Sequence, residues 1–521
     1  MTGFHTLETR EPNRRNGHAG IFCQFTFPVE EAPTAMKIDT GATAWMLAAT
    51  AMVLFMTPGL AFFYGGMTRA KSVLNMMMMS FGSIISVTVL WVLFGHSVAF
   101  TDNGSSAVNK VLGGFDAVGL KGTVTAIQQG TSPDHNIPLL VYSAFQLTFA
   151  IITVALISGA IADRAKFGAW MAFTVAWASL VYFPVAHWVW GTGWLNKLGI
   201  EDFAGGTVVH VNAGAAGLAL AIVLGRRRGW PKEPMRPHNL PFVLLGVAIL
   251  WFGWFGFNAG SEIGVDTTTG LAFMNTQIAT AVAAGAWLVV EKLRDGHATT
   301  LGAASGAVAG LVAITPACGF VDPWASVVLG LVAGAVCAYA IGLKYRLGYD
   351  DSLDVVGVHL VGGAIGAVSL GFLAAYPALS SQHKGLFYGG GPYQLGMQAL
   401  GPVVIGLYSF GMAWVIGTVI DKTMGFRIDE EDEATGVDLT THAETAYDLA
   451  PAGAGSVRTG HASALPGHGL ATPGRTSGGP GSSEPSGSES AGSEPAGPER
   501  AASGSVAAGG SSAEKKVEAQ Q

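Results

Sequence analysis

Charged residues are the first thing that this sequence has too few of. Only 12% of its 521 residues are Asp, Glu, Lys or Arg, about half the usual share for a soluble globular domain. Half of the residues are apolar, and a soluble fold of this size would not lack charge so widely. The deficit is concentrated between residues 41 and 420, in stretches of twenty or more mainly apolar residues. Each stretch is long enough to cross a bilayer as a helix.

Cysteine is scarce as well. The three cysteines, Cys23, Cys318 and Cys337, are too few and too scattered for a disulfide framework or a metal site. We expect them to be small buried side chains, and we expect no metal and no cofactor. The net charge of −7 comes mostly from the C-terminal tail, so it indicates no partner, and we expect no nucleic acid.

The apolar stretches predict an all-α membrane protein with about eleven transmembrane helices. We place the spans at 42–66, 73–100, 138–161, 168–190, 204–225, 240–261, 269–290, 299–318, 323–343, 355–375 and 393–420. An odd number of spans puts the two ends of the membrane domain on opposite sides of the bilayer.

Basic residues in the short loops indicate the orientation. They follow the odd-numbered spans up to the ninth, as Arg69, Lys71, Arg164, Lys166, Arg226, Arg227, Arg228, Lys232, Arg236, Lys292, Arg294, Lys344 and Arg346. The opposite loops carry only Lys110, Lys121, Lys197 and Lys384. The positive-inside rule therefore predicts a multi-pass protein of the cell membrane, with its N-terminus outside and its C-terminus in the cytoplasm. Arg10, Arg14 and Arg15 oppose an outside N-terminus, but the five loops outweigh them, and Met36 is a candidate start.

The two ends of the chain differ from the apolar part in composition. Residues 1–36 are polar, contain no apolar run long enough for a signal peptide, and are expected to be a disordered extension. Residues 37–424 form the predicted transmembrane domain, and the acidic residues 425–450 a cytoplasmic regulatory segment. Residues 451–521 are rich in Gly, Ser, Pro, Ala and Glu. They cannot bury enough apolar surface to fold, so we expect a disordered tail.

One short segment occurs twice. Residues 209–220 read VHVNAGAAGLAL and residues 358–370 read VHLVGGAIGAVSL, and both place a histidine before a face of small residues. The copies lie in the fifth and tenth predicted spans, so they must run in opposite directions. This predicts an inverted repeat of five plus five helices around a central pore, with an additional C-terminal helix. The small residues would let the two helices approach closely and set His210 beside His359.

The two histidines also have a simpler interpretation. A histidine in an apolar helix can be a core residue whose ring is hydrogen-bonded to a backbone carbonyl. Two histidines at equivalent positions of a repeat favour a pathway instead, because ionisable groups inside a membrane are costly. His96, His135 and His187 have no repeat partner, and we expect them to be structural or exposed.

Six segments resemble one protein family. They read FYGGMTRAKSVLN at 63–75, AFQLTF at 144–149, DFAGGTVVHVNAG at 202–214, WFGFNAGS at 254–261, TPACGF at 315–320 and DVVGVH at 354–359. Together they closely resemble the ammonium transporter family of the bacterial type, and DFAGGTVVHVNAG looks like its signature. The resemblance covers about 37–449.

The resemblance implies a function and an assembly. It implies a homotrimer in which each subunit conducts ammonium, ammonia and methylammonium through its own pore, and it implies no enzymatic activity. It also implies residue roles: Phe149, Trp190 and Ser261 match an outer substrate-binding site, Phe149 and Phe257 a phenyl gate, His210 and His359 twin pore histidines, and Asp202 the acidic residue of the outer vestibule.

These residue types suit ammonium. Ammonium has nearly the size and charge of potassium, but it has directional N–H donors and can release a proton. Aromatic faces at the mouth would attract the cation, and Ser261 would accept one N–H. Beyond the phenyl rings the path becomes apolar, so a bare alkali ion would bear a large desolvation cost. Ammonium would avoid this cost by deprotonation, and the two imidazoles would give ammonia polar partners.

Asp202 and several large apolar side chains have more than one interpretation. Asp202 could bind the cation directly, or it could cap backbone amides and hold the turn 202–210. We prefer the cap, because an exposed carboxylate would attract potassium equally. Packing, lipid contact or interfacial anchoring is expected of Trp188, Trp251, Trp254 and the methionine run 76–79.

Two other functions compete with transport. An ammonium sensor would bind its ligand at the same mouth, but only the stretch 425–449 and the tail follow the last span. An intramembrane hydrolase would use His210 or His359 as a base, but no nucleophile motif accompanies either histidine. The resemblance further implies a trimeric PII-type nitrogen signal protein as a partner, for which loop 226–238 and the stretch 425–449 are the available surfaces.

Overall fold

Apolar helices make up most of the chain, as the hydropathy pattern predicts. The computed structural model describes residues 37–130, 134–375 and 383–447, and these form a helical bundle with one short hairpin. The two segments predicted to be disordered, 1–36 and 451–521, lie outside the described residues. Cys318 and Cys337 are buried and free, as expected.

The described residues form α-helices, short π-helical and 3-10 turns, and two short strands. In chain order, with η marking π-helical and 3-10 turns, they are α1 (Thr40–Met67), α2 (Val73–Leu90), η1 (Trp91–Gly95), α3 (His96–Phe100), α4 (Ser106–Asn109), η2 (Val118–Leu120), β1 (Ile127–Gln129), β2 (Asn136–Pro138), α5 (Leu139–Ile157), η3 (Ser158–Ile161), α6 (Phe167–Trp177), η4 (Ala178–Tyr182), α7 (Phe183–Val189), α8 (Trp194–Lys197), η5 (Gly206–Val211), α9 (Asn212–Leu224), α10 (Leu240–Gly260), α11 (Thr267–Asp295), α12 (Thr300–Ile314), α13 (Pro323–Ala340), α14 (Leu343–Leu347), η6 (Val356–Leu360), α15 (Val361–Leu373), η7 (Leu386–Tyr388), α16 (Pro392–Met424), α17 (Glu430–Thr435) and α18 (Val437–His442).

Ten helical segments of the described chain are long and apolar enough to cross a membrane. They are α1; α2 with η1 and α3; α5 with η3; α6 with η4, α7 and α8; η5 with α9; α10; α11; α13 with α14; η6 with α15; and α16. Each coincides with one predicted span. A helix pairs its backbone polar groups internally, which the absence of water in a bilayer requires.

The eighth predicted span, 299–318, is shorter in the structure than expected. Its helix α12 has 15 residues, which corresponds to a length of about 22 Å against ~30 Å for a hydrocarbon core. The residues from Ala304 to Ile314 are all buried, so neighbouring helices enclose α12. The predicted eleven spans are therefore ten long segments and one enclosed short helix.

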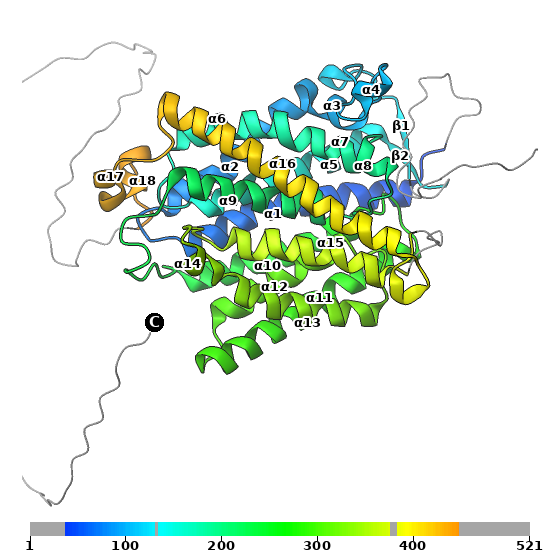
Figure 1. Cartoon of the computed structure of the whole chain (residues 1–521). Helices are drawn as coiled ribbons and strands as arrows, with labels where there is room; N and C mark the ends of the chain where they lie inside the picture. The colour runs from blue at the N-terminus through cyan, green and yellow to red at the C-terminus, as the bar shows by residue number, and fades with distance from the viewer. Residues whose placement is uncertain (1–36, 131–133, 376–382, 448–521) are drawn as a thin grey trace, which may run out of the picture. The chain divides into compact units, whose positions relative to one another are not determined.

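The bundle has two distinct ends (Figure 1). The hairpin of β1 and β2, in which Ile127 pairs with Pro138, lies at one end, which we call the hairpin end. The short helices α17 and α18 lie at the opposite end, which we call the C-terminal end. Helix α16 runs diagonally across the other helices between these two ends (Figure 1).

The two copies of the repeated segment cross in opposite directions, as predicted. A Cβ atom on Gly214 would lie 2.4 Å from the amide nitrogen of Leu360, and one on Gly363 would lie 2.6 Å from the carbonyl oxygen of Gly206. Rising residue number on one helix therefore corresponds to falling number on the other. Glycine is needed at both positions, because a methyl group would collide with the facing backbone.

Candidate functional site

Both repeated histidines lie on π-helical turns. His210 is in η5 and His359 is in η6, 149 residues apart, and the two turns occupy equivalent positions of the repeat. A π-turn inside an α-helix is rare and occurs frequently at functional sites. Gly205 precedes η5 with a φ of 112°, a backbone conformation that side chains other than glycine rarely adopt.

The two imidazole rings face each other inside the bundle. The Nδ1 atoms of His210 and His359 are 3.3 Å apart, and the ring centroids are 5.4 Å apart. Only 1% of His210 and 3% of His359 is exposed. Two Nδ1 atoms at this distance share one proton when one nitrogen donates and the other accepts. One Nε2 is then a donor and the other an acceptor, and the Nε2 of His210 has no partner among the described residues.

A narrow, almost entirely apolar cavity adjoins the two histidines. Its volume is about 10 Å³, roughly the space for one water-sized molecule. The residues that line it are Met56, Leu60, Phe63, Ile152, Leu156, His210, Leu250, Trp254, Phe257, Val308 and His359. The indole Nε1 of Trp254 donates to the hydroxyl of Thr315 at 2.8 Å, so the imidazoles are the polar groups that this lining offers to a small molecule.

Aromatic rings continue from the histidines toward the hairpin end. His210 and Phe257 have ring centroids 6.1 Å apart, and Phe257 is stacked on Phe149 with centroids 4.0 Å apart and an interplanar angle of 19°. Phe149 in turn meets Trp190 edge to face, at 5.8 Å and 84°. Trp190, Phe149, Phe257, His210 and His359 thus form one continuous series of ring contacts.

Hydrogen bonds hold Trp190, the outermost ring of this series, and Ser261, which follows Phe257 on α10. The indole Nε1 of Trp190 donates to the carbonyl of Asp202 at 2.8 Å. Ser261 ends α10 one helical turn after Phe257, and its hydroxyl donates to the Phe257 carbonyl at 2.8 Å. The lone pairs of the Ser261 oxygen remain available as acceptors. Indole faces and a hydroxyl acceptor are groups that can bind a small cation with N–H donors.

Asp202 is turned toward its own chain segment. Its carboxylate accepts the backbone amides of Gly205 at 2.9 Å, Gly206 at 2.6 Å, Thr207 at 2.9 Å and Val208 at 3.1 Å, together with the Thr207 hydroxyl. These are the free amides at the start of a helix, so Asp202 caps η5. Burial raises the pKa of the Asp202 carboxyl, and the Thr207 and backbone hydrogen bonds oppose that rise.

Asp351 has the equivalent position in the second half, and none of the motifs in the sequence pointed to it. It lies eight residues before His359, as Asp202 lies eight residues before His210. Its carboxylate accepts the backbone amides of Val355 at 3.1 Å and Val356 at 2.7 Å, at the start of η6. Burial raises the pKa of Asp351 to about 6. The equal spacing from each histidine is the signal that would have found this residue.

Trp254 belongs to the cavity wall, although the sequence indicated only packing or anchoring. Its ring is stacked on His210 with centroids 5.4 Å apart and an interplanar angle of 20°. Trp188 and His187 are structural by contrast. The indole of Trp188 donates to the carbonyl of Val111, and the ring of His187 contacts the carbonyls of Ala99 and Asn109.

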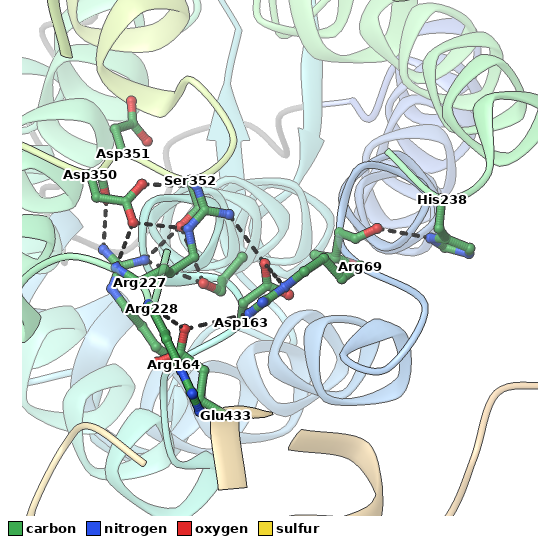
Figure 2. A network of polar contacts seen from close by, with 12 residues as sticks. Arg69, Asp163, Arg164, Arg227, Arg228, His238, Asp350, Asp351, Ser352 and Glu433 are labelled. Carbon is green, nitrogen blue, oxygen red and sulfur yellow. Dashed lines mark hydrogen bonds and ion pairs between the residues drawn. The ribbon is translucent and has the colours of Figure 1, made fainter. Parts of the chain in front are cut away.

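A network of ion pairs occupies the C-terminal end, outside the series of rings (Figure 2). Arg227 forms two hydrogen bonds to the Asp350 carboxylate, at 2.9 and 2.8 Å, and a third to Asp163 at 3.1 Å. Arg69 connects Asp163 at 3.2 Å to Glu433 of α17 at 3.5 Å. The network therefore ties α17 to the segment that precedes Asp351.

The rest of the C-terminal segment is attached to the same end. The Asp438 carboxylate accepts the amides of Leu74 at 3.0 Å and Asn75 at 2.8 Å, at the start of α2. The Tyr447 hydroxyl contacts Nε2 of His238 at 3.0 Å. Both surfaces that the sequence offered to a protein partner, loop 226–238 and the described part of 425–449, therefore touch each other.

Known sequences resemble this chain over nearly its whole helical part. A sequence profile described as Ammonium Transporter Family matches residues 44–447. An ammonium transporter of Mycobacterium tuberculosis is 54% identical over 453 residues, which cover 83% of this chain and 94% of that protein. An ammonium transporter of Bacillus subtilis is 46% identical over 411 residues, which cover 79% of this chain and 99% of that protein.

Solved structures resemble it as well. Mep2 of Candida albicans matches with a TM-score of 0.69 and 32% identity, covering 76% of this chain and 88% of that one. A structure described as a sensor Amt protein matches with a TM-score of 0.70 and 28% identity, covering 77% and 98%. These likenesses confirm the predicted all-α membrane fold and the resemblance drawn from six segments. The sequence relatives are named as transporters and not as enzymes, as expected.

Proposed function

Because the chain belongs to the ammonium transporter family, we propose that it moves ammonium across the cell membrane along the series of rings described above. The observation that carries this proposal is the 3.3 Å contact between the Nδ1 atoms of His210 and His359 beside a cavity that is otherwise apolar. Such a pair of ionisable groups is costly inside a membrane unless it lines a pathway.

Ammonium first binds at the outer mouth, which Phe149, Trp190 and Ser261 form. The π faces of the two aromatic residues attract the cation by about 1–2 kcal/mol in a partly dry site. The Ser261 hydroxyl, which already donates to Phe257, accepts one N–H of ammonium. Asp202 supports the mouth from behind, since its carbonyl fixes the Trp190 indole and its carboxylate is occupied by backbone amides.

Selection against potassium takes place at the stacked rings of Phe149 and Phe257. Their centroids are only 4.0 Å apart, so the rings must move for anything to pass, and the path beyond them is apolar. A bare potassium ion would lose its hydration there with almost no compensation. Ammonium releases its proton and continues as ammonia, which hydrogen-bonds the imidazoles. The imidazole pair offers the released proton a route, because histidine changes its protonation near neutral pH.

The decisive experiment places the purified full chain in liposomes and measures methylammonium uptake together with ammonium-dependent current. His210→Ala and His359→Ala are each expected to reduce the current about tenfold or more, because each removes one half of the proton route. His297→Ala is the matched control, since His297 is exposed in a loop and is expected to leave both signals unchanged. Wild-type uptake with full current in both pore variants would contradict the proposed route.

An ammonium sensor is the second candidate, and two observations favour keeping it. The chain resembles a structure described as a sensor Amt protein, and Glu433 in the C-terminal segment is bound to Arg69 at the end of the bundle. A sensor would bind methylammonium without moving it. Saturable binding to the detergent-solubilised protein, combined with no uptake in liposomes, would therefore favour this second function over transport.

The proposal includes an orientation and two partners. The C-terminal end, which carries loop 226–238 and α17, faces the cytoplasm, and the N-terminus lies outside. The protein is a homotrimer, which chemical cross-linking in membranes and native mass spectrometry would test.

A trimeric PII-type signal protein binds loop 226–238 and the segment 425–449. A pull-down from nitrogen-replete cells that fails to recover such a protein would count against this partner.

A further inference from the structure

A buried ion pair lies beside the pore mouth and belongs to no part of the series of rings. Nδ1 of His383 is 2.5 Å from Oε1 of Glu201. Glu201 lies in the connection 198–205 between α8 and η5, and His383 lies 182 residues later, between α15 and α16. Their side chains are 2% and 11% exposed, so the contact is almost fully withdrawn from solvent.

The connection 198–205 determines the position of two parts of the pore at once. The carbonyl of Asp202, the residue after Glu201, accepts the Trp190 indole at 2.8 Å. The carboxylate of Asp202 caps η5, the turn that contains His210. A shift of this connection would therefore move the indole at the mouth and the start of the histidine-bearing turn together.

Other described contacts that anchor this connection include neutral hydrogen bonds and the edge-to-face contact of Phe203 with Phe320, whose ring centroids are 5.4 Å apart. The Tyr393 hydroxyl of α16 donates to the Leu198 carbonyl at 3.0 Å, and the amide of Phe203 donates to the Pro316 carbonyl at 3.1 Å. The pair of Glu201 with His383 is the ionic contact among them. It binds the connection to the opposite half of the repeat, because His383 follows α15, the helix of the second copy.

Stability alone does not account for a carboxylate at this place. Oε2 of Glu201 is buried and has no partner among the described residues, so the group loses hydration that one imidazole only partly replaces. Buried ion pairs of this kind are often no more stabilising than apolar residues of similar size. What a directional pair provides is a fixed distance between two chain segments.

We propose that Glu201 and His383 are positioning residues for the pore mouth, and that their ion pair holds Trp190 and the start of η5 in the arrangement that binds ammonium. The effect of this pair on transport rests on the proposed function, whereas its effect on the position of the chain segment does not. Neither side chain touches the substrate path. Loss of the pair should weaken substrate capture and leave the later steps, at Phe257 and His210, largely as they are.

The pair is fully charged only within a window of pH. The Glu201 carboxylate raises the pKa of His383, so the positive charge is lost only as the pH rises through that raised value. Burial raises the pKa of Glu201, against the lowering effect of His383, so the negative charge is lost as the pH falls through that value. Other titratable groups on the surrounding segments are Lys197, Asp202, Asp322, Lys384, Tyr388 and Tyr393.

The transport test uses Glu201→Gln, His383→Gln and the double variant in liposomes, with methylammonium from about pH 5.5 to about pH 8.5, the range in which histidine titrates. Each single variant is expected to raise the KM about fivefold, the double variant no further, and the maximal rate should stay within about twofold. The wild-type KM should rise wherever the pair loses a charge, as the pH falls through the pKa of Glu201 or rises through that of His383, and the variants should lose this dependence. Asp295→Asn is the matched control, because it breaks an exposed pair of Asp295, the last residue of α11, with Arg294. It should change neither the KM nor its pH dependence.

A second measurement keeps the outcome independent of transport. Amide hydrogen exchange of residues 203–208 is expected to be faster in His383→Gln than in wild type, and unchanged in Asp295→Asn. His383→Gln can be measured even if Glu201→Gln does not fold, because His383 is the more exposed partner of the pair. No uptake by the wild type would overturn the proposed function and leave the exchange result standing. Unchanged exchange, or a lower maximal rate with an unchanged KM and pH profile, would overturn the positioning role.

Discussion

The two halves of the repeat start their histidine-bearing turns with the same residue type and surround it differently. Asp202 accepts four backbone amides and one hydroxyl, and its carbonyl holds the Trp190 indole. The Asp351 carboxylate accepts hydrogen bonds from two backbone amides. The Asp351 carbonyl accepts a hydrogen bond from Nζ of Lys344 at 3.0 Å. Lys344 also pairs with Asp354 at 2.7 Å.

Some of these features are common to both halves because of the duplication, and others are specific to one half. The duplication provides two crossing helices, two π-turns and two facing imidazoles. The first half adds an aromatic mouth, with the pair of Glu201 and His383 next to Asp202, and the second adds the pair of Lys344 with Asp354. We therefore expect cation selection to depend on the first half, and the second half to tolerate changes that the mouth does not.

The largest effect is expected where the halves are most alike, at the two crossing glycines. Gly363→Ala would place a methyl group 2.6 Å from the Gly206 carbonyl, and Gly214→Ala one 2.4 Å from the Leu360 amide. Overpacking of this kind costs about 1–3 kcal/mol and should abolish methylammonium uptake by separating the histidines. Gly411→Ala in α16, where nothing lies within 4 Å, is the control. Full uptake in either crossing variant would show that the close approach is dispensable.

The next effect should distinguish the two caps. Removing an N-cap lowers the free energy of unfolding by about 0.5–2 kcal/mol. The loss for Asp202→Ala should lie at or above the upper end of this range, because more amides lose their acceptor than in Asp351→Ala. Thermal unfolding of the two variants in the same detergent gives the ranking. Asp202→Asn and Asp351→Asn, which keep one acceptor oxygen, should each recover part of the loss. A greater loss for Asp351→Ala would reverse the comparison.

A smaller effect is expected at the C-terminal end. Glu433→Gln removes the charge that pairs with Arg69 and Arg427, at a cost of about 1 kcal/mol, because both arginines are partly exposed and water screens the pairs. Limited proteolysis should then cut the segment 425–447 faster, while the KM for methylammonium stays at its wild-type value. Glu430→Gln, an exposed residue of the same helix, is the control. A changed KM would mean that the C-terminal end influences the mouth directly.

The smallest effect is expected at the mouth hydroxyl. Ser261→Ala removes one neutral acceptor, worth about 0.5–1.5 kcal/mol, and should raise the KM about twofold to tenfold without changing the maximal rate. Ser261→Thr keeps the hydroxyl and should behave like wild type in the same uptake assay. An unchanged KM in Ser261→Ala would remove this residue from the proposed binding site.

Much of the fold could be predicted because the membrane imposes simple rules on the sequence. Apolar runs of sufficient length must form helices in lipid, so the predicted spans and observed segments agree in order. The enclosed helix α12 is the exception, since hydropathy does not distinguish a helix that faces lipid from one that faces other helices. The repeat was visible through His210 and His359 and their small neighbours, whereas Asp351 was overlooked because its surrounding residues differ from those of Asp202.

The sequence by itself determined the number and order of the apolar segments, the antiparallel duplication and the family, because these follow from composition, spacing and motif. Only the tertiary structure decided that both histidines lie on π-turns with their Nδ1 atoms in contact, that Trp254 stacks on His210, and that Glu201 meets His383. Each of these depends on side chains far apart in the chain, whose rotamers and distances are set by packing. No local pattern in the sequence encodes them.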